Sequence, residues 1–176
     1  MPSIGHIAVG AAAGRLQAVR DAPGARRRAM VLLSAASLAP DADGVSFLLG
    51  IPYGAPWGHR GAAHSLTFAL AIGIAAGAAG RAVGLPFLRT AIFGTAAAAS
   101  HGLLDSMTDG GLGIALLWPW TNRRFFAPWR PIPVAPIGAG MLSTRGLEVV
   151  LAELLLFAPF WLYAFWPRGG RRRERS

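Results

Sequence analysis

Residues 146–166 read GLEVVLAELLLFAPFWLYAFW, and this stretch is the clearest candidate for a membrane span in the chain. Its length of 21 residues matches the roughly 20 that a helix needs to cross a bilayer core. The stretch ends in Trp161, Tyr163 and Trp166, and arginines follow at positions 168 and 171–173. Interfacial aromatic rings followed by basic residues are typical of the cytoplasmic end of a transmembrane helix. We therefore expect a spanning helix here and a basic tail, residues 168–176, in the cytoplasm.

Four further apolar stretches precede this one: residues 4–19, 29–39, 65–85 and 87–104. Glycines recur at four-residue spacing in the first and third, which lets membrane helices approach closely. The stretch 29–39, with about 11 residues, is too short to span alone. The predicted fold class is all-α, a polytopic helical membrane bundle of four to five apolar helices in one domain over residues 1–167. Residues 106–145 are rich in Pro, Trp and Arg and predict an irregular interfacial loop.

Composition excludes several functional classes. The 176 residues are 53% hydrophobic with a mean hydropathy of +0.44, which is too apolar for an ordinary soluble domain. Cysteine is absent, so a metal must bind through nitrogen and oxygen. All 17 basic residues are arginine, which excludes a Schiff-base lysine and a P-loop lysine. The net charge of +9 does not indicate nucleic acid, because the arginines flank the apolar stretches.

The arginines also predict an orientation. If the runs 15–28, 81–89 and 168–175 all face the cytoplasm, 12 arginines lie inside and five outside, as the positive-inside rule requires. The five outside are at positions 60, 123, 124, 130 and 145. The start of the first and third stretches and the end of the second and fourth then share the non-cytoplasmic side. That side carries the rarest residues of the chain.

All four histidines and three of the eight acidic residues fall at those ends, in otherwise apolar surroundings. An unpaired charge is costly there, so such groups indicate a function. They occur in four short segments: His6; Asp41 with Asp43; His59-Arg60 with His64-Ser65; and His101 with Asp105. His101 and Asp105, four residues apart on a helix, project from one face and can reach one ion. We predict that one or two divalent ions bind there.

Each segment alone also has a structural explanation. His101 and Asp105 can bond to each other within a bundle, and the Pro40-Asp41-Ala42-Asp43 segment can cap a helix or form a turn. Together they favour a metal site, for which the predicted ligands are His6, Asp41, Asp43, His59, His64, His101 and Asp105. Histidine and carboxylate ligands without sulfur suit zinc, manganese or iron. No HExxH motif is present, which argues against a zincin-type intramembrane protease.

These segments, followed by Leu117-Trp-Pro-Trp-x-Asn-Arg-Arg, make residues 1–140 similar to the YdjM-type family of bacterial inner-membrane metal-dependent hydrolases. The resemblance implies a membrane-embedded metallohydrolase in the inner membrane. The motif pattern also resembles, more weakly, the His/Asp zinc site of zinc-dependent phospholipase C enzymes. The chain departs from the family at Ala63, where a hydroxyl residue usually precedes the second histidine of the motif. That departure affects a local hydrogen bond and leaves the predicted ligands in place.

The expected function is hydrolysis of a phosphoester or similar bond in a lipid-like or amphipathic substrate, with water activated by a metal that is most simply zinc. Arg60 and Asp43 are the predicted catalytic residues, and Ser65, Arg123 and Arg124 the predicted substrate-binding residues. The expected partners are the bilayer and that substrate, without nucleic acid. One alternative is a metal-ion or proton transporter or sensor that uses the same cluster. Another is a structural membrane module in which the cluster only holds the helices together.

Overall fold

The computed structural model describes residues 3–18, 24–136 and 138–167, and within them the regular structure is helical. The longer helices are α1 (Ser3–Gln17), α2 (Ala25–Leu38), α4 (Leu66–Ala82), α5 (Phe87–Ser106), α6 (Thr144–Leu156) and α7 (Ala158–Phe165). The shorter ones are η1 (Ala39–Gly44), α3 (Val45–Leu48), η2 (Ala62–His64) and η3 (Gly138–Leu142). The all-α prediction is therefore confirmed. The predicted basic tail, residues 168–176, lies outside the described residues.

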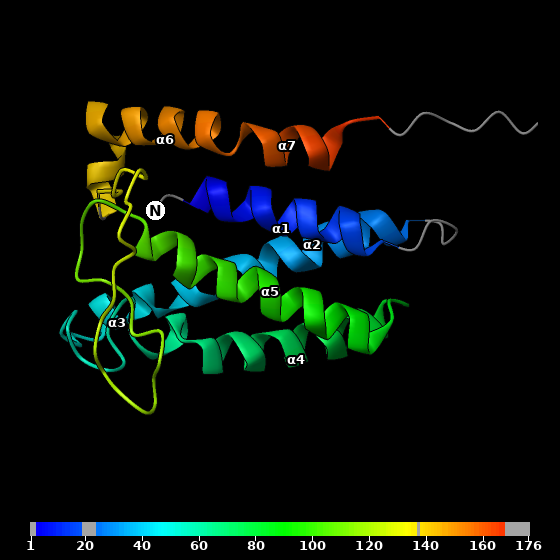
Figure 1. Cartoon of the computed structure of the whole chain (residues 1–176), viewed down its shortest axis with the longest axis horizontal. Coiled ribbons are helices and arrows are strands. Elements are labelled where there is room, and N and C mark those ends of the chain that lie inside the picture. The colour runs from blue at the N-terminus through cyan, green and yellow to red at the C-terminus, as the bar shows by residue number, and fades with distance from the viewer. Residues whose placement is uncertain (1–2, 19–23, 137, 168–176) are drawn as a thin grey trace, which may run out of the picture.

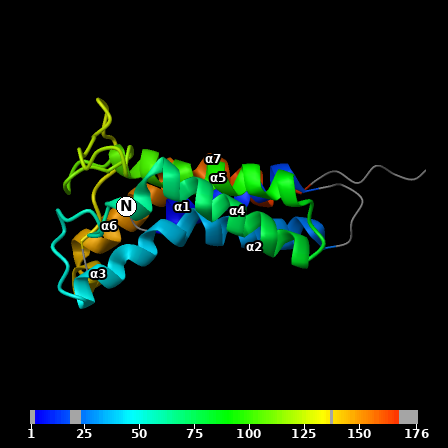
Figure 2. The same ribbon diagram turned by 90° about the horizontal axis from the view of Figure 1, so that it is seen from below.

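The longer helices lie side by side along the long axis of the molecule, as Figure 1 shows. α1 packs against α2, α4 against α5, and α7 against α1. The short elements η1, α3 and η2 gather with the loop after α5 at one end, and the view in Figure 2 agrees. The α4–α5 connection, flanked by Arg81 and Arg89, lies at the opposite end. His64, at the start of α4, is thus separated from those arginines by the length of that helix.

Small residues fill the interior of the bundle, and large apolar ones lie on its outside. A Cβ added to Gly10 would lie 2.5 Å from the Ser34 Cα, so α1 and α2 are in close backbone contact. Most of the buried hydrophobic residues are alanines. Leu70 and Ile74 of α4 are more than half exposed, as is Ile92 of α5. This distribution is the reverse of that in a soluble bundle, and it is typical of helices that pack on one another within lipid.

Overpacking should reveal how tight this interior is. Ala97 and Ala96 are neighbours on α5, the first 2% exposed and the second on the outside. We expect Ala97→Leu to lower the free energy of unfolding by about 1–3 kcal/mol, because the added atoms must displace the facing helices. Ala96→Leu, the matched control, should leave it within about 0.5 kcal/mol. Chemical unfolding of both variants measures the difference, and equal values would contradict close packing.

Two of the predicted stretches differ from the structure. The stretch 29–39 belongs to a continuous helical run of 24 residues, Ala25–Leu48, so the expectation that it is too short to span is wrong. The run is longer because it begins at Ala25, before the arginines at 26–28, and continues into η1. Pro40 lies in the first turn of η1, where a missing N–H is tolerated. The stretch 146–166 is divided at Phe157 by a bend of 58°. Pro159 explains the break, since its ring excludes the carbonyl of Leu155 from a regular helix.

By length and composition, one described helix, Ala25–Leu48, is able to cross a membrane, or two if the bent α6–α7 pair counts as one span. α4 is apolar but shorter. The predicted bundle of four to five membrane helices is therefore not confirmed by this criterion.

Candidate metal centre

The predicted site residues all lie at the end of the bundle where the short elements gather. His6 is in the first turns of α1, and Asp41 is in η1 directly after α2. His64 ends η2, and His101 and Asp105 lie in the last turns of α5. Because consecutive helices alternate in direction, these segments, distant in sequence, meet at one end (Figure 1). The hairpin arrangement thus explains why the rare residues occur at alternate helix ends.

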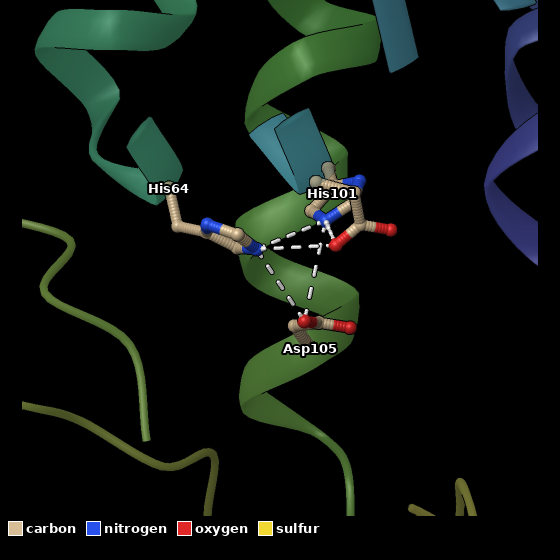
Figure 3. Close-up of side chains that lie close together, drawn as sticks. His64, His101 and Asp105 are labelled. Carbon is tan, nitrogen blue, oxygen red and sulfur yellow. Dashed lines mark hydrogen bonds and ion pairs between the residues drawn. The ribbon is translucent and has the colours of Figure 1, made fainter. Parts of the chain in front are cut away.

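Four ligand atoms from three segments converge on one point: Asp41 Oδ1, His64 Nε2, His101 Nε2 and Asp105 Oδ2. His101 Nε2 lies 3.1 Å from His64 Nε2, 3.3 Å from Asp41 Oδ1 and 4.0 Å from Asp105 Oδ2. His64 Nε2 lies 3.7 Å from Asp41 Oδ1 and 3.6 Å from Asp105 Oδ2. A tetrahedral ion with bonds of 2.0–2.1 Å has ligand–ligand distances of roughly 3.3 Å. The five distances above, 3.1–4.0 Å, lie around that value, and three of the four residues are labelled in Figure 3.

A hydrogen bond to the backbone determines which ring nitrogen of His101 is free to bind an ion. Its Nδ1 lies 2.7 Å from the carbonyl oxygen of Ser37, and a carbonyl only accepts, so Nδ1 carries the hydrogen and donates it. In the neutral ring, Nε2 is then a lone-pair acceptor that faces His64 and two carboxylates. Metal-bound histidines are typically held in this way, with the distal nitrogen bonded to a carbonyl or carboxylate. A cation among these acceptors satisfies them all.

His64 is oriented by a carboxylate on its other nitrogen. Its Nδ1 lies 3.0 Å from Asp43 Oδ2, the carboxylate–histidine pair common behind metal ligands. Burial by itself lowers the pKa of the His64 imidazole, but its contacts with Asp105, Asp41 and Asp43 raise that pKa to about 10. The surrounding carboxylates therefore give this point a strong affinity for positive charge.

Asp43 connects the four-atom group to a second group. Its Oδ1 lies 2.6 Å from His59 Nδ1, and its Oδ2 accepts from the backbone N–H of Arg60 at 3.1 Å. Asp43, His59 and His64 form a second set with metal-ligand spacing, and it shares His64 with the first. Six of the seven predicted ligands thus fall into two adjoining groups. His6, the seventh, stacks on the His101 ring at a centroid distance of 3.6 Å.

The comparisons with known proteins identify the family of the chain. The profile of the YdjM inner membrane protein family matches residues 1–170 of the chain. The chain belongs to the YdjM inner membrane protein family. It is similar to the inner membrane protein YbcI of Escherichia coli (strain K12), with 44% identity over 123 residues, covering 68% of this chain and 70% of YbcI. No solved structure matches. The family resemblance predicted from the motifs is confirmed, and this YdjM family member is an inner membrane protein.

In this YdjM family member, the Arg60 side chain holds the Asp105 carboxylate in place. Its side chain is 2% exposed, and Nε lies 3.2 Å from Asp105 Oδ2. Nη1 donates to Thr108 Oγ1 and to the carbonyl of Gly110, each at 3.0 Å. Its backbone has a φ of 62°, the left-handed region that non-glycine residues rarely adopt. The strained backbone and the buried guanidinium together hold Arg60 against Asp105.

The three predicted substrate-binding residues have other contacts. The Ser65 hydroxyl accepts from the Phe68 N–H at 3.1 Å and caps α4. Arg124 donates to the carbonyls of Tyr53 at 2.8 Å and His59 at 3.1 Å, and so holds the loop before η2. Arg123 is exposed, with its guanidinium carbon 5.5 Å from the centre of the Phe125 ring. None of the three is in the group of four ligand atoms.

A pocket of about 380 Å³ opens at this end of the bundle. Asp41, His59 and Arg60 form its polar side, and Phe47, Tyr53 and Pro136 are among the other residues that line it. The Asp41 side chain is 28% exposed, whereas those of His64, His101 and Asp105 are nearly inaccessible. Solvent or a substrate can therefore reach the four-atom group from the Asp41 side.

Sequence reasoning missed Ser37 and Thr108. Ser37 contributes only its backbone carbonyl to His101, and no residue pattern encodes that contact. Thr108 follows Asp105 by three residues and bonds back to its carbonyl at 2.8 Å, so its proximity in sequence was the available signal.

Proposed function

We propose that this YdjM family member is a membrane-embedded metal-dependent hydrolase. The observation that carries the proposal is the convergence of Asp41, His64, His101 and Asp105 at tetrahedral ligand spacing. The proposed ion is divalent, most simply zinc, with manganese or iron as alternatives that the same ligands accept. When bound, the ion supplies Lewis-acid chemistry and an acidified water. Because four protein ligands complete a tetrahedral shell, that water or a substrate oxygen would add as a fifth ligand on the exposed side of Asp41.

The protein residues around the ion have separate roles in this proposal. Asp43 holds the His64 ring through Nδ1, so that Nε2 points into the group. Arg60 keeps the Asp105 carboxylate in place and adds positive charge at the floor of the pocket, where charge develops on a transferred phosphoryl group. His59, on the pocket wall and bonded to Asp43 through Nδ1, orients that carboxylate from the other side.

We further propose that the bundle crosses the membrane with α1, α2, α4, α5 and the bent α6–α7 pair. The exposed leucines of α6, Leu147, Leu151 and Leu155, support lipid contact on this helix, as do Leu70 and Ile74 on α4. The arginines at positions 26–28, 81 and 89 lie at the end opposite the cluster, which supports a cytoplasmic location for that end and for the tail.

A lipid-like or other amphipathic phosphoester is the proposed substrate. At the end of a membrane bundle the pocket lies near the level of lipid headgroups. The rings of Phe47, Tyr53 and His59, with centroids 5.5–5.9 Å apart, give the pocket an apolar wall beside its polar floor. A headgroup ester with an apolar neighbour fits that combination, and the volume of about 380 Å³ accommodates the headgroup rather than the whole lipid.

Metal analysis of the purified protein tests this proposal. We expect zinc or manganese bound in detergent solution, and a lower unfolding temperature after chelation, because an ion that binds only the folded state stabilises it. Phosphodiester and phosphomonoester lipids should then be hydrolysed by the metal-loaded protein and not by the chelated protein. Absence of any bound transition metal together with unchanged stability after chelation would rule the proposal out.

A further inference from the structure

His6 is the site residue whose chemistry the four-atom group leaves unexplained. Its side chain is fully buried, and neither ring nitrogen has a hydrogen-bond partner among the residues that the structure describes. The ring lies flat on His101, with an interplanar angle of 12°. A buried imidazole with two unsatisfied nitrogens is costly, so such groups usually have a partner that has yet to be identified.

A carboxylate oxygen close to His6 points to that partner. His6 Nε2 lies 3.5 Å from Asp105 Oδ1, which is too long for a good hydrogen bond. It is close to the roughly 3.4 Å that separates two ligands bound to one ion at about 2.1 Å. The Asp105 carboxylate thus has one oxygen toward each side: Oδ2 toward His64 and His101, and Oδ1 toward His6.

Figure 3 shows this division of the carboxylate. One Asp105 oxygen takes part in the dashed contacts with His64 and His101, and the other points away from His64. α1, which carries His6, approaches from that other side. A carboxylate placed between two sets of nitrogen ligands is the common bridging element of two-ion sites, whose ions lie about 3.5–4 Å apart.

We propose that His6 Nε2 and Asp105 Oδ1 hold a second divalent cation, with Asp105 bridging it to the ion of the four-atom group. The inference rests on the proposed function, because it requires the first ion. The ligand class is a borderline cation such as manganese or zinc, which accepts imidazole and carboxylate together. With two protein ligands, both buried, the second position should bind its ion more weakly than the four-atom group, and water would complete its coordination. A two-ion centre is suited to phosphoester hydrolysis, since it contacts both the attacking and the leaving oxygen.

Metal stoichiometry and spin coupling test the second position without relying on activity. The protein, purified in detergent, is titrated with Mn²⁺ alone, and bound metal is counted while electron paramagnetic resonance detects coupling between ions. We expect two ions per chain, with the coupled signal of a bridged pair. His6→Phe keeps a ring on His101 but has no nitrogen, so it should bind one ion, lose the coupled signal and keep the wild-type elution profile.

The outcomes separate this inference from the proposed function. One ion in the wild-type protein, with no coupling, overturns the second position and leaves the four-atom site standing. Two coupled ions in both wild type and His6→Phe overturn the assignment to His6. No bound ion in the wild type overturns both proposals. If His6→Phe does not fold, the wild-type stoichiometry and coupling still decide between one ion and two.

Discussion

Replacing His101 with alanine is expected to abolish binding of the proposed metal ion. The substitution deletes the nitrogen whose distances to the other three ligand atoms are 3.1–4.0 Å. Changing a residue that only supports a ligand typically lowers affinity 10–100-fold, and loss of the ligand itself should exceed about 100-fold. Competition with a fluorescent zinc chelator measures the affinity. Hydrolytic activity should fall with the bound metal, because both depend on the same atom.

Ser100→Ala is the matched control for that experiment. Ser100 is the neighbour of His101 on α5, and its hydroxyl donates to the Ala97 carbonyl within the helix, at 2.7 Å. The variant should bind metal as the wild type does. If His101→Ala is folded, as judged by circular dichroism and gel filtration, and still binds a stoichiometric ion, the four-atom group is not the metal site.

The packing of the bundle argues against an ion path along α1 and α5. A transport path needs polar groups that continue from the cluster to the other end of the bundle. Beyond His6, the buried residues of α1 are small and apolar until Arg15: Ala8, Gly10, Ala11, Ala12 and Gly14. On α5, the buried positions between Thr90 and His101 are likewise alanine or glycine: Ala91, Gly94, Ala97 and Ala98. These small residues pack closely, so among the described residues no polar path leads along α1 or α5 from the cluster toward the opposite end of the bundle. The pocket beside Asp41 is the route by which solvent reaches the cluster.

The sequence was sufficient to predict where the site residues meet. Apolar stretches alternate in direction when they pack as hairpins, so residues at alternate ends must share one end of the bundle. That geometry placed His6, His64 and Asp105 together without any knowledge of side-chain contacts. It also placed Arg81 and Arg89 at the opposite end, as the structure has them.

Which partner each of those side chains contacts could not be predicted from the sequence. Asp41 and Asp43 occur in one short segment, yet Asp41 faces His101, whereas Asp43 bonds to His59 and lies 3.0 Å from the far nitrogen of His64. That difference depends on the 3₁₀ geometry of η1, which turns neighbouring side chains to different partners. The left-handed backbone of Arg60 was equally unpredictable from the sequence. It accompanies side-chain contacts with the loop after α5 and does not follow from local residue preference.

The break in the last helix shows a different limit of sequence reasoning. The composition of residues 146–166 predicts a continuous span, and Pro159 alone allows either a kink or a break. The buried Glu153 accepts the Gly5 N–H at 3.1 Å and so ties α6 to the start of α1. Arg15 donates to the Trp166 carbonyl at 2.6 Å and ties the end of α7 to the other end of α1. These tertiary contacts accompany the bend.

Replacing Arg60 with methionine is expected to destabilise the metal-free protein more than any surface change. Methionine keeps much of the volume but leaves the Asp105 carboxylate buried without the guanidinium 3.2 Å away. Removing one partner of a buried ion pair typically costs about 3–5 kcal/mol, and we expect a loss at the lower end of that range because His64, 3.6 Å from the same carboxylate, still compensates part of its charge. Chemical unfolding in mixed micelles, carried out with a chelator present, measures the loss.

The dependence of that loss on metal is the decisive part of the prediction. A divalent ion at Asp105 supplies positive charge of its own, so Arg60→Met should lose less stability with saturating zinc than with chelator. Arg123→Met is the control, since Arg123 is exposed and its change should stay within about 0.5 kcal/mol under both conditions. An equal loss for Arg60→Met with and without zinc would mean that Asp105 does not bind the ion. Because the guanidinium and the ion both lie against one carboxylate, stability and metal binding in this protein should be coupled through Asp105.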